Sequence, residues 1–168
     1  WLATGEPPVA RGYTPSIYSM LPKLLERTGN FENGSITGIY TVLVEGDDVN
    51  EPISDTVRGI IDGHIVLSRK IAMRNHYPAI DVLGSVSRLM NDIADKGQIA
   101  AAGKLRSLLS IYDANYDLIN IGAYKSGTNK ALDESISKIE KINGFLQQNV
   151  NDKVPFETSV EMMEAAIV

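Results

Sequence analysis

The stretch that decides the fold is Ser35-Ile-Thr-Gly-Ile-Tyr-Thr-Val-Leu-Val44. It is rich in β-branched residues and nearly continuously apolar, whereas a half-exposed strand would alternate apolar with polar side chains. This pattern is typical of a strand that is covered on both faces, as in a parallel sheet with helices on either side. The stretch therefore predicts an α/β fold.

The segments around this strand continue the alternation of helix and strand. Residues 14–28 carry apolar side chains at the i, i+3, i+4, i+7 and i+8 spacing of one helix face. The order indicates the last part of an α/β domain, which we place at residues 1–91. Because two or three strands with an exposed edge are marginal alone, we expect further strands before Trp1. The later elements are a helix over 53–61, a strand over 64–67, a helix over 68–75 and a strand over 80–83.

Beyond about residue 92 only helical periodicity remains. Three apolar stripes with helical spacing follow one another, and no strand pattern interrupts them. The sequence therefore predicts an all-helical domain at residues 92–168. The stripes are Leu105, Leu108, Leu109, Tyr112 and Tyr116, then Leu132, Ile136, Ile139, Ile142 and Leu146, and last Val160, Met163 and Ile167.

The composition excludes several classes of protein. The chain has 168 residues, of which 43% are hydrophobic and 22% charged, as in a soluble globular protein. A net charge of −5 argues against a nucleic-acid partner, and no apolar run is long enough for an integral membrane protein. The absence of cysteine excludes disulfides, thiolate metal sites and cysteine nucleophiles, and it favours a reducing compartment.

Familiar catalytic motifs are absent from the chain. The run Gly122-Ala-Tyr-Lys-Ser-Gly127 does not have the spacing of a phosphate-binding loop. His64 and His76 do not form a His-Glu-x-x-His pair, and no serine lies in a Gly-x-Ser-x-Gly elbow, so neither a metal site nor a serine hydrolase is predicted.

Two charged features of the sequence, an acidic run and an arginine, are candidates for a functional role. The acidic run Glu45, Asp47, Asp48 and Glu51 lacks the calcium-loop pattern, so it is either a solvated loop or a surface for a basic partner. Arg88 stands among small and apolar residues, and from residue type alone it is an arginine that pairs with a carboxylate.

Long collinear runs of the sequence resemble the flagellar and type III protein-export ATPases, which are homologous to the subunits of rotary ATP synthases. The resemblance is strong over about residues 5–90, and Tyr116-Asp-Leu-Ile-Asn-Ile-Gly122 continues it more weakly. The runs that carry it are Gly5-Glu-Pro-Pro8, Gly12-Tyr13, Leu24-Leu-Glu-Arg27, Gly34-Ser-Ile-Thr37, Tyr40-Thr-Val-Leu-Val-Glu-Gly-Asp-Asp48, Asn50-Glu-Pro-Ile53, Arg58-Gly-Ile-Ile-Asp-Gly-His-Ile-Val-Leu-Ser-Arg69, His76-Tyr-Pro-Ala-Ile-Asp-Val-Leu83 and Ser85-Val-Ser-Arg-Leu-Met90.

The resemblance implies that the chain is the C-terminal portion of such an enzyme: the end of a RecA-like P-loop ATPase domain with a parallel sheet, followed by a helical domain. The full-length enzyme would form a homohexamer and use ATP with magnesium. Its phosphate loop, catalytic glutamate and magnesium-binding aspartate would lie before Trp1. We therefore expect the fragment alone to be inactive and to bind no nucleotide tightly.

The resemblance also implies roles for individual residues. Arg88 matches the arginine finger, which reaches the γ-phosphate of a neighbouring subunit's nucleotide. Tyr77 falls where the family stacks an aromatic ring on adenine, although a Tyr-Pro turn packed on the core is the alternative. The loop from Glu45 to Glu51 would face the central pore, where six copies would attract a basic coiled-coil stalk protein.

The function implied is a flagellum-specific ATPase, cytoplasmic and peripheral at the flagellar base, that energises type III export. The helical domain would face the export gate and chaperone–substrate complexes, so Phe145, Met162 and Met163 are either docking surface or ordinary helix packing, which we take as the default. A non-catalytic docking module and an injectisome ATPase are the alternatives. The run Glu45-Gly-Asp-Asp-Val-Asn-Glu-Pro52 argues against a rotary synthase subunit.

Overall fold

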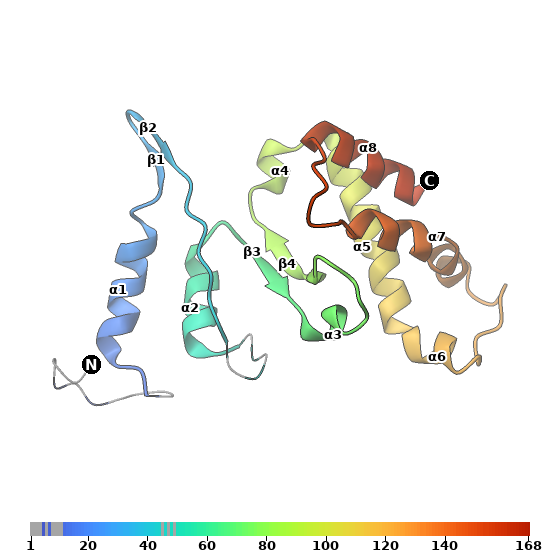
Figure 1. Cartoon of the computed structure of the whole chain (residues 1–168), viewed down its shortest axis with the longest axis horizontal. Helices are drawn as coiled ribbons and strands as arrows, with labels where there is room; N and C mark the ends of the chain where they lie inside the picture. Colours follow the sequence, from blue (N-terminus) through green and yellow to red (C-terminus); the bar gives the residue numbers. More distant parts are fainter. Residues whose placement is uncertain (1–4, 6, 8–11, 45, 47, 49) are drawn as a thin grey trace. The chain divides into compact units, whose positions relative to one another are not determined.

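The chain forms two compact units, one up to residue 64 and one from residue 65 onward, in a computed structural model. The structure describes residues 5, 7, 12–44, 46, 48 and 50–168. Each unit is described below by itself. Figure 1 shows their elements in the order of the chain.

The described residues of the first unit form two helices and a hairpin. Helix α1, Pro15–Leu25, begins at a proline, which suits the first turn because its missing N–H would have no helical partner. Helix α2 spans Pro52–Ile60 and also has proline at its start. The two helices pack together and bury Leu25 and Val57. Both helices are therefore as predicted, within a few residues at each end.

Strands β1, Gly29–Phe31, and β2, Gly34–Ile36, form an antiparallel hairpin that the sequence analysis did not predict. Gly29 pairs with Ile36 and Phe31 with Gly34. Gly29 and Gly34 have φ of +138° and +146°, a backbone conformation that residues other than glycine rarely adopt. The glycines thus permit the turn.

The long buried strand predicted over residues 35–44 is wrong for most of its length. Strand β2 ends at Ile36, and residues 37–44 form no regular element. Ile39 and Leu43 are 93% and 89% exposed. The reason is that a strand needs a neighbour to accept its hydrogen bonds, and no described residue pairs with this segment.

A pair of strands lies at the start of the second unit, and the first of them begins two residues before it. Strands β3, Gly63–Leu67, and β4, Ile80–Ser87, are hydrogen-bonded neighbours. Between them lies the short helix α3, Arg69–Ala72, whose N-cap Ser68 accepts a hydrogen bond from the Ile71 N–H at 3.4 Å. Strand β4 is longer than the predicted segment over 80–83, because it continues as far as Ser87.

The rest of this unit is all-helical, as predicted, but it has five helices where the periodicity predicted three. The stripe from Leu105 to Tyr116 is divided between two helices, and the short helix that begins at Met90 was not predicted. The N-caps Asp95 and Asn129 begin the two longest, because their side-chain oxygens accept hydrogen bonds from free N–H groups of the first turn. The helices are α4, Met90–Ile93; α5, Lys96–Ala114; α6, Tyr116–Asn120; α7, Lys130–Leu146; and α8, Phe156–Ile167.

The core of the second unit lies where α5, α7 and α8 meet. Leu105, Leu108, Ile142 and Ala166 are buried at its centre. Phe145 and Met163 pack against them, so ordinary packing is confirmed for these two, while Met162 is exposed. Within the described part of the chain, no helix is both long enough and apolar enough to cross a membrane.

Polar contacts of Ser135 and Lys138 also link the three helices. The hydroxyl of Ser135, which is fully buried, donates to the Leu108 carbonyl at 2.9 Å and links α7 to α5. The Lys138 ammonium on α7 donates to the carbonyls of Ile167 (2.5 Å) and Val168 (2.6 Å). A cation at this place satisfies carbonyl groups that have no helical partner at the end of α8.

Candidate functional site

Arg88 lies at the surface, in the short connection between β4 and α4. It directly follows the last residue of β4, and its side chain is exposed. The carbonyl of the next residue, Leu89, accepts hydrogen bonds from the N–H groups of Asp92 (2.9 Å) and Ile93 (3.1 Å). Arg88 is therefore held between a strand and the first turn of a helix, from where a long cationic side chain can reach a group outside its own chain.

Local hydrogen bonds fix the middle of β4. The Asp81 carboxylate accepts from the Gly84 N–H at 2.9 Å, and the Ser85 hydroxyl donates to the Asp81 carbonyl at 2.6 Å. The same hydroxyl oxygen accepts from the Val66 N–H of β3 at 2.9 Å. A Cβ at Gly84 would lie 2.9 Å from the Asp81 carboxylate, which is too close for another residue without a shift.

One arginine of α5 joins the helices to this strand. The guanidinium of Arg106 donates to the carbonyls of Val82, Leu83 and Ser85. The helical elements and the strand that leads to Arg88 are therefore fastened together by side chain as well as by packing.

Tyr77 lies in the loop before β4, and its side chain is 54% exposed. Its carbonyl accepts a hydrogen bond at 2.9 Å from the backbone N–H of Gln148, just after α7. The turn that contains Gln148 is closed by Asp152, whose carboxylate accepts from the Asn149 N–H and side-chain amide, both at 3.0 Å. The ring of Tyr77 is thus available to a ligand, while its backbone is tied to the end of a helix.

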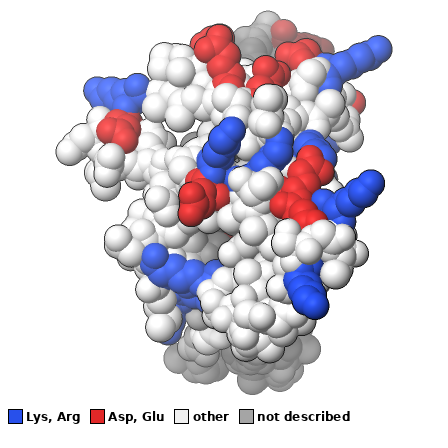
Figure 2. Space-filling model, turned by 90° about the vertical axis from the view of Figure 1, so that its right-hand side faces the viewer, with Lys and Arg blue, Asp and Glu red and all other residues white. Residues whose placement is uncertain are grey.

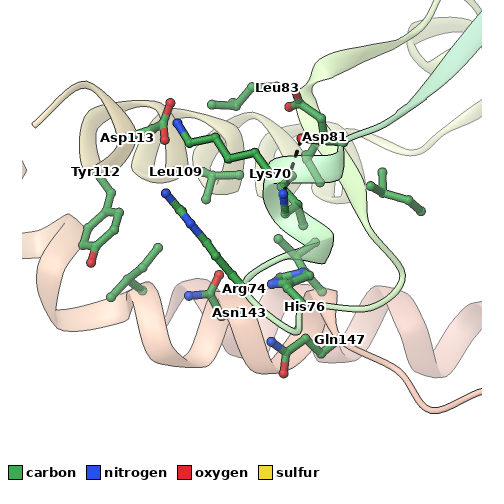
Figure 3. Close-up of a pocket in the computed structure, with 16 residues that line it drawn as sticks. Lys70, Arg74, His76, Asp81, Leu83, Leu109, Tyr112, Asp113, Asn143 and Gln147 are labelled. Carbon is green, nitrogen blue, oxygen red and sulfur yellow. Dashed lines mark hydrogen bonds between the residues drawn. The ribbon is translucent and has the colours of Figure 1, made fainter. Parts of the chain in front are cut away.

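A cavity of about 330 Å³ opens between α3 and β4 on one side and α5 and α7 on the other. In Figure 3 the side chain of Lys70 extends from α3 toward α5, where Asp113 lies, and Arg74, which follows α3, also lines the cavity. The volume is at the lower limit of small-molecule pockets. Neither Tyr77 nor Arg88 lines it, so the cavity does not coincide with the predicted site residues.

Arg74 is already engaged inside the second unit. Its guanidinium carbon lies 4.7 Å from the centroid of the Tyr116 ring, a cation–π contact. The Tyr116 ring meets that of Tyr112 edge to face, with the centroids 6.1 Å apart. These contacts give Arg74 a structural role, because they join the segment after α3 to the start of α6.

The acidic run is only partly within the described residues, because Glu45 and Asp47 lie outside them. The Asp48 carboxylate accepts from the Asn50 N–H at 3.1 Å. Glu51 is the N-cap residue of α2 and is only 4% exposed. The two described acids of the run therefore differ, since Asp48 is half-buried and Glu51 is buried.

Charge and metal ligands are dispersed over the described residues. On the face drawn in Figure 2, basic and acidic side chains are interspersed, and the described atoms of that face show no continuous basic patch. No three His, Asp or Glu side chains among the described residues gather in a way that could hold a metal ion.

Comparison with known proteins assigns the chain to a family. Residues 1–87 match the family model described as the ATP synthase alpha/beta family, nucleotide-binding domain. The chain belongs to the ATP synthase alpha/beta family. Residues 94–165 match a second model, that of the type III secretion EscN ATPase C-terminal domain.

Individual members of the family match almost the whole chain. It is 54% identical over 159 residues to the flagellum-specific ATP synthase of Bacillus subtilis, covering 95% of this chain and 36% of that protein. It is 44% identical to the assembled type III secretion ATPase EscN of enteropathogenic E. coli, with a TM-score of 0.96, covering 99% of this chain and 40% of EscN. EscN in complex with its central stalk EscO matches with 42% identity and a TM-score of 0.88, over 99% of this chain and 40% of that one.

These matches confirm two predictions. The resemblance to flagellar and type III export ATPases is confirmed, and so is the fold class, the end of a RecA-like ATPase domain followed by a helical domain. The chain spans 36% of the length of its flagellar relative, and it therefore represents a fragment of such a protein.

The sequence analysis did not identify two residues that contact the site segments, Arg106 and Gln148. Arg106 is one of several charged residues on an amphipathic helix, and nothing in its spacing distinguishes it from a solvent-facing lysine or arginine. Gln148 acts through its backbone N–H, which every residue except proline carries. No signal in a single sequence would have identified either.

Proposed function

We propose that the complete protein containing this chain hydrolyses ATP in a hexameric ring and thereby energises type III export of flagellar proteins. The observation that carries the proposal is the 54% identity with the Bacillus subtilis flagellum-specific ATP synthase. An injectisome ATPase is the second candidate, supported by the TM-score of 0.96 with EscN. The flagellar assignment is preferred because the identity with EscN is lower, at 44%.

We assign residues 1–91 to the end of the nucleotide-binding domain and residues 92–168 to the helical C-terminal domain. The ranges matched by the two family models, 1–87 and 94–165, support a division near residue 91. The contacts of Arg106 and Gln148 with β4 and the loop before it would then join the two domains.

Arg88 is proposed as the arginine finger. During γ-phosphoryl transfer, negative charge spreads over the equatorial oxygens of the phosphoryl group, and a fixed guanidinium beside them offsets it. The support is that Arg88 is exposed at the end of a strand whose conformation is fixed by hydrogen bonds. The nucleotide would belong to a neighbouring subunit.

The test is Arg88→Ala in the complete protein. We expect ATP binding to change by less than about twofold, while turnover falls by about 10³-fold or more, the usual value of an arginine finger. Arg27→Ala, at another exposed arginine, is the matched control and should retain turnover. Normal turnover of the Arg88→Ala protein would refute the assignment.

Tyr77 is proposed to stack on the adenine of its own subunit's ATP. The half-exposed ring supports this role, because a core-packed Tyr-Pro turn would bury it. Stacking of a base on an aromatic ring contributes about 1–3 kcal/mol, so Tyr77→Ala should weaken ATP binding by roughly 5- to 150-fold. Tyr77→Phe should bind as the unchanged protein does. Unchanged affinity of the alanine variant would favour a purely structural role.

The acidic run Glu45, Asp47, Asp48 and Glu51 is proposed to face a basic coiled-coil stalk. The half-buried Asp48 is a better candidate for direct contact than Glu51, which is buried at the start of α2. Neutralising Asp47 and Asp48 to Asn should weaken stalk binding, and more so at low salt, where surface charges are least screened. If the variant and the unchanged protein bind the stalk with equal affinity at low and at high salt, the proposal is contradicted.

The remaining partners follow from the same assignment. We propose that the helical domain contacts export chaperone–substrate complexes and the export gate, and that the protein is cytoplasmic and peripheral at the flagellar base.

ATP with magnesium would be used by the complete enzyme, and the ion is assigned to no residue of this chain. The isolated chain should neither hydrolyse ATP nor bind it tightly. A phosphate-binding loop in the complete sequence would exclude a purely non-catalytic docking module.

A further inference from the structure

Arg106 makes an unusual set of contacts for an exposed arginine of a helix. One of its terminal nitrogens, Nη1, donates to the Val82 carbonyl at 2.5 Å and to the Ser85 carbonyl at 3.2 Å. The other, Nη2, donates to the Leu83 carbonyl at 3.2 Å. Three carbonyls within four residues of β4 thus receive hydrogen bonds from one side chain that lies more than twenty positions later in the chain.

The chemistry of the guanidinium suits this arrangement. It is planar, always charged and carries five N–H donors in a fixed fork, so it can serve several carbonyls at once with little rearrangement. Hydrogen bonds from a charged donor are also stronger than those between neutral groups. Helix α5 packs beside β4 (Figure 1), so the side chain of Arg106 spans a short distance to reach the strand.

The fastened segment lies immediately before Arg88. Ser85, the last residue whose carbonyl Arg106 holds, is three residues from Arg88, which corresponds to at most about 10 Å of extended chain. On the other side of Arg88, the Leu89 carbonyl is held in the first turn of α4. The backbone of Arg88 is therefore fixed from both directions, and on the strand side Arg106 adds to the hydrogen bonds within β4 and with β3.

We propose that Arg106 is a positioning residue for Arg88: it holds the end of β4 in the place from which the Arg88 guanidinium reaches the transferring phosphoryl group. This inference rests on the proposed role of Arg88. It adds that the helical domain takes part in catalysis without touching the nucleotide. A displacement of about 1 Å at a catalytic group can cost about 10²-fold in rate, so loosening the strand should lower turnover.

A simple role in stability would have different consequences. If Arg106 only joined α5 to β4, its loss would reduce stability and would lower activity to the same extent whether or not Arg88 is present. If it positions Arg88, its loss lowers kcat, leaves KM for ATP nearly unchanged and has no effect once Arg88 is gone.

The experiment uses the complete protein with Arg106→Ala, Arg106→Lys, Arg88→Ala and the double variant Arg106→Ala/Arg88→Ala. We expect Arg106→Ala to lower kcat by about 10- to 100-fold with KM changed by less than about twofold. Arg106→Lys should lie between, because the ammonium keeps the charge and three donors but lacks the planar fork. In single-turnover measurements, the double variant should be as slow as Arg88→Ala alone.

The control is Lys104→Ala on the same helix. The Lys104 ammonium contacts the Glu134 carboxylate of α7 at 2.7 Å, and no contact of it with β4 is described. This variant removes a polar link of α5 without releasing the strand, so its kcat should be unchanged. The melting temperature of each variant identifies any that is not folded, and Arg106→Lys carries the test if Arg106→Ala does not fold.

Different results separate the inference from the proposed function. Normal turnover of Arg88→Ala would refute the role of Arg88 and the inference with it. Loss of turnover in Arg88→Ala together with normal turnover in Arg106→Ala would overturn only the inference. An equal loss from Arg106→Ala with and without Arg88 would also overturn it, because the effect would then not pass through Arg88.

Discussion

Residues 37–44 and the helices α5, α7 and α8 all carry large apolar side chains but differ in how far these are buried. Ile39 is 93% exposed, whereas Ile142 on α7 is completely buried. A helix satisfies its own backbone and needs only one apolar face covered, which the neighbouring helices provide. A strand needs a partner for its backbone as well as for its side chains. The apolar periodicity of the helices therefore predicted correctly which side chains are buried by this chain. The apolar, strand-like pattern of residues 37–44 did not.

The largest effect is expected from a pair of matched substitutions that compare a buried with an exposed isoleucine. Ile142→Ala should lower the free energy of unfolding by about 2–5 kcal/mol, because it leaves a cavity in the helical core. Ile39→Ala should change it by less than about 0.5 kcal/mol, since the side chain contacts mainly water. Urea unfolding followed by circular dichroism measures both. Equal losses at the two positions would show that residues 37–44 are also packed in solution.

A second test asks whether a polar contact contributes to the same core. Ser135→Ala should cost about 1 kcal/mol, because the buried hydroxyl no longer donates to the Leu108 carbonyl. Ser137→Ala is the control: its hydroxyl is exposed and donates only locally, to the Glu134 carbonyl at 2.7 Å. The same urea experiment applies. If the two serine variants are equally stable, the Ser135 hydrogen bond makes no measurable contribution to holding α5 against α7.

The smallest effect is expected at the loop before α7, where the Asp133 carboxylate accepts from the Tyr124 hydroxyl (2.9 Å), the Gly127 N–H (2.9 Å) and the Ser126 hydroxyl (3.1 Å). These hydrogen bonds, chiefly that from Tyr124, lower the pKa of Asp133 below its ordinary value. A carboxyl with a lower pKa in the folded state adds stability above its unfolded pKa, and this stability is lost as pH falls through the folded pKa.

Asp133→Asn should therefore be slightly less stable than the unchanged chain at neutral pH, and the difference should shrink as the pH falls below the usual range of aspartate. Asp117→Asn, which removes one negative charge from an exposed position, controls for net charge. Thermal unfolding between neutral and acidic pH measures the difference. A gap that stays constant, or that widens in acid, would contradict the assignment of the lowered pKa to the folded loop.

The sequence predicted secondary structure correctly where an element is stabilised by contacts close along the chain. It predicted α1, α2, α5, α7 and α8, because their apolar spacing is met by neighbouring turns and helices. It did not predict the hairpin at Gly29–Ile36, and it placed a strand over residues 37–44 that needs a partner not among the described residues.

For the site, the resemblance to export ATPases singled out Arg88 and Tyr77, and their roles remain predictions. The structure added what a single sequence does not carry. The reach of Arg106 to three carbonyls depends on how α5 packs against β4, and the bond from Gln148 depends on where the backbone turns after α7. Neither follows from residue type or spacing.

The backbone bond between the Gln148 N–H and the Tyr77 carbonyl has a mechanical consequence. It connects the trailing end of α7 directly to the loop that carries the aromatic ring, with no flexible side chain between them. If α7 tilts or slides, this bond draws the backbone of the Tyr77 loop with it. If Tyr77 stacks on adenine as proposed, movement of the helical bundle would be transmitted to the base, and a protein bound to those helices would alter nucleotide release from a distance.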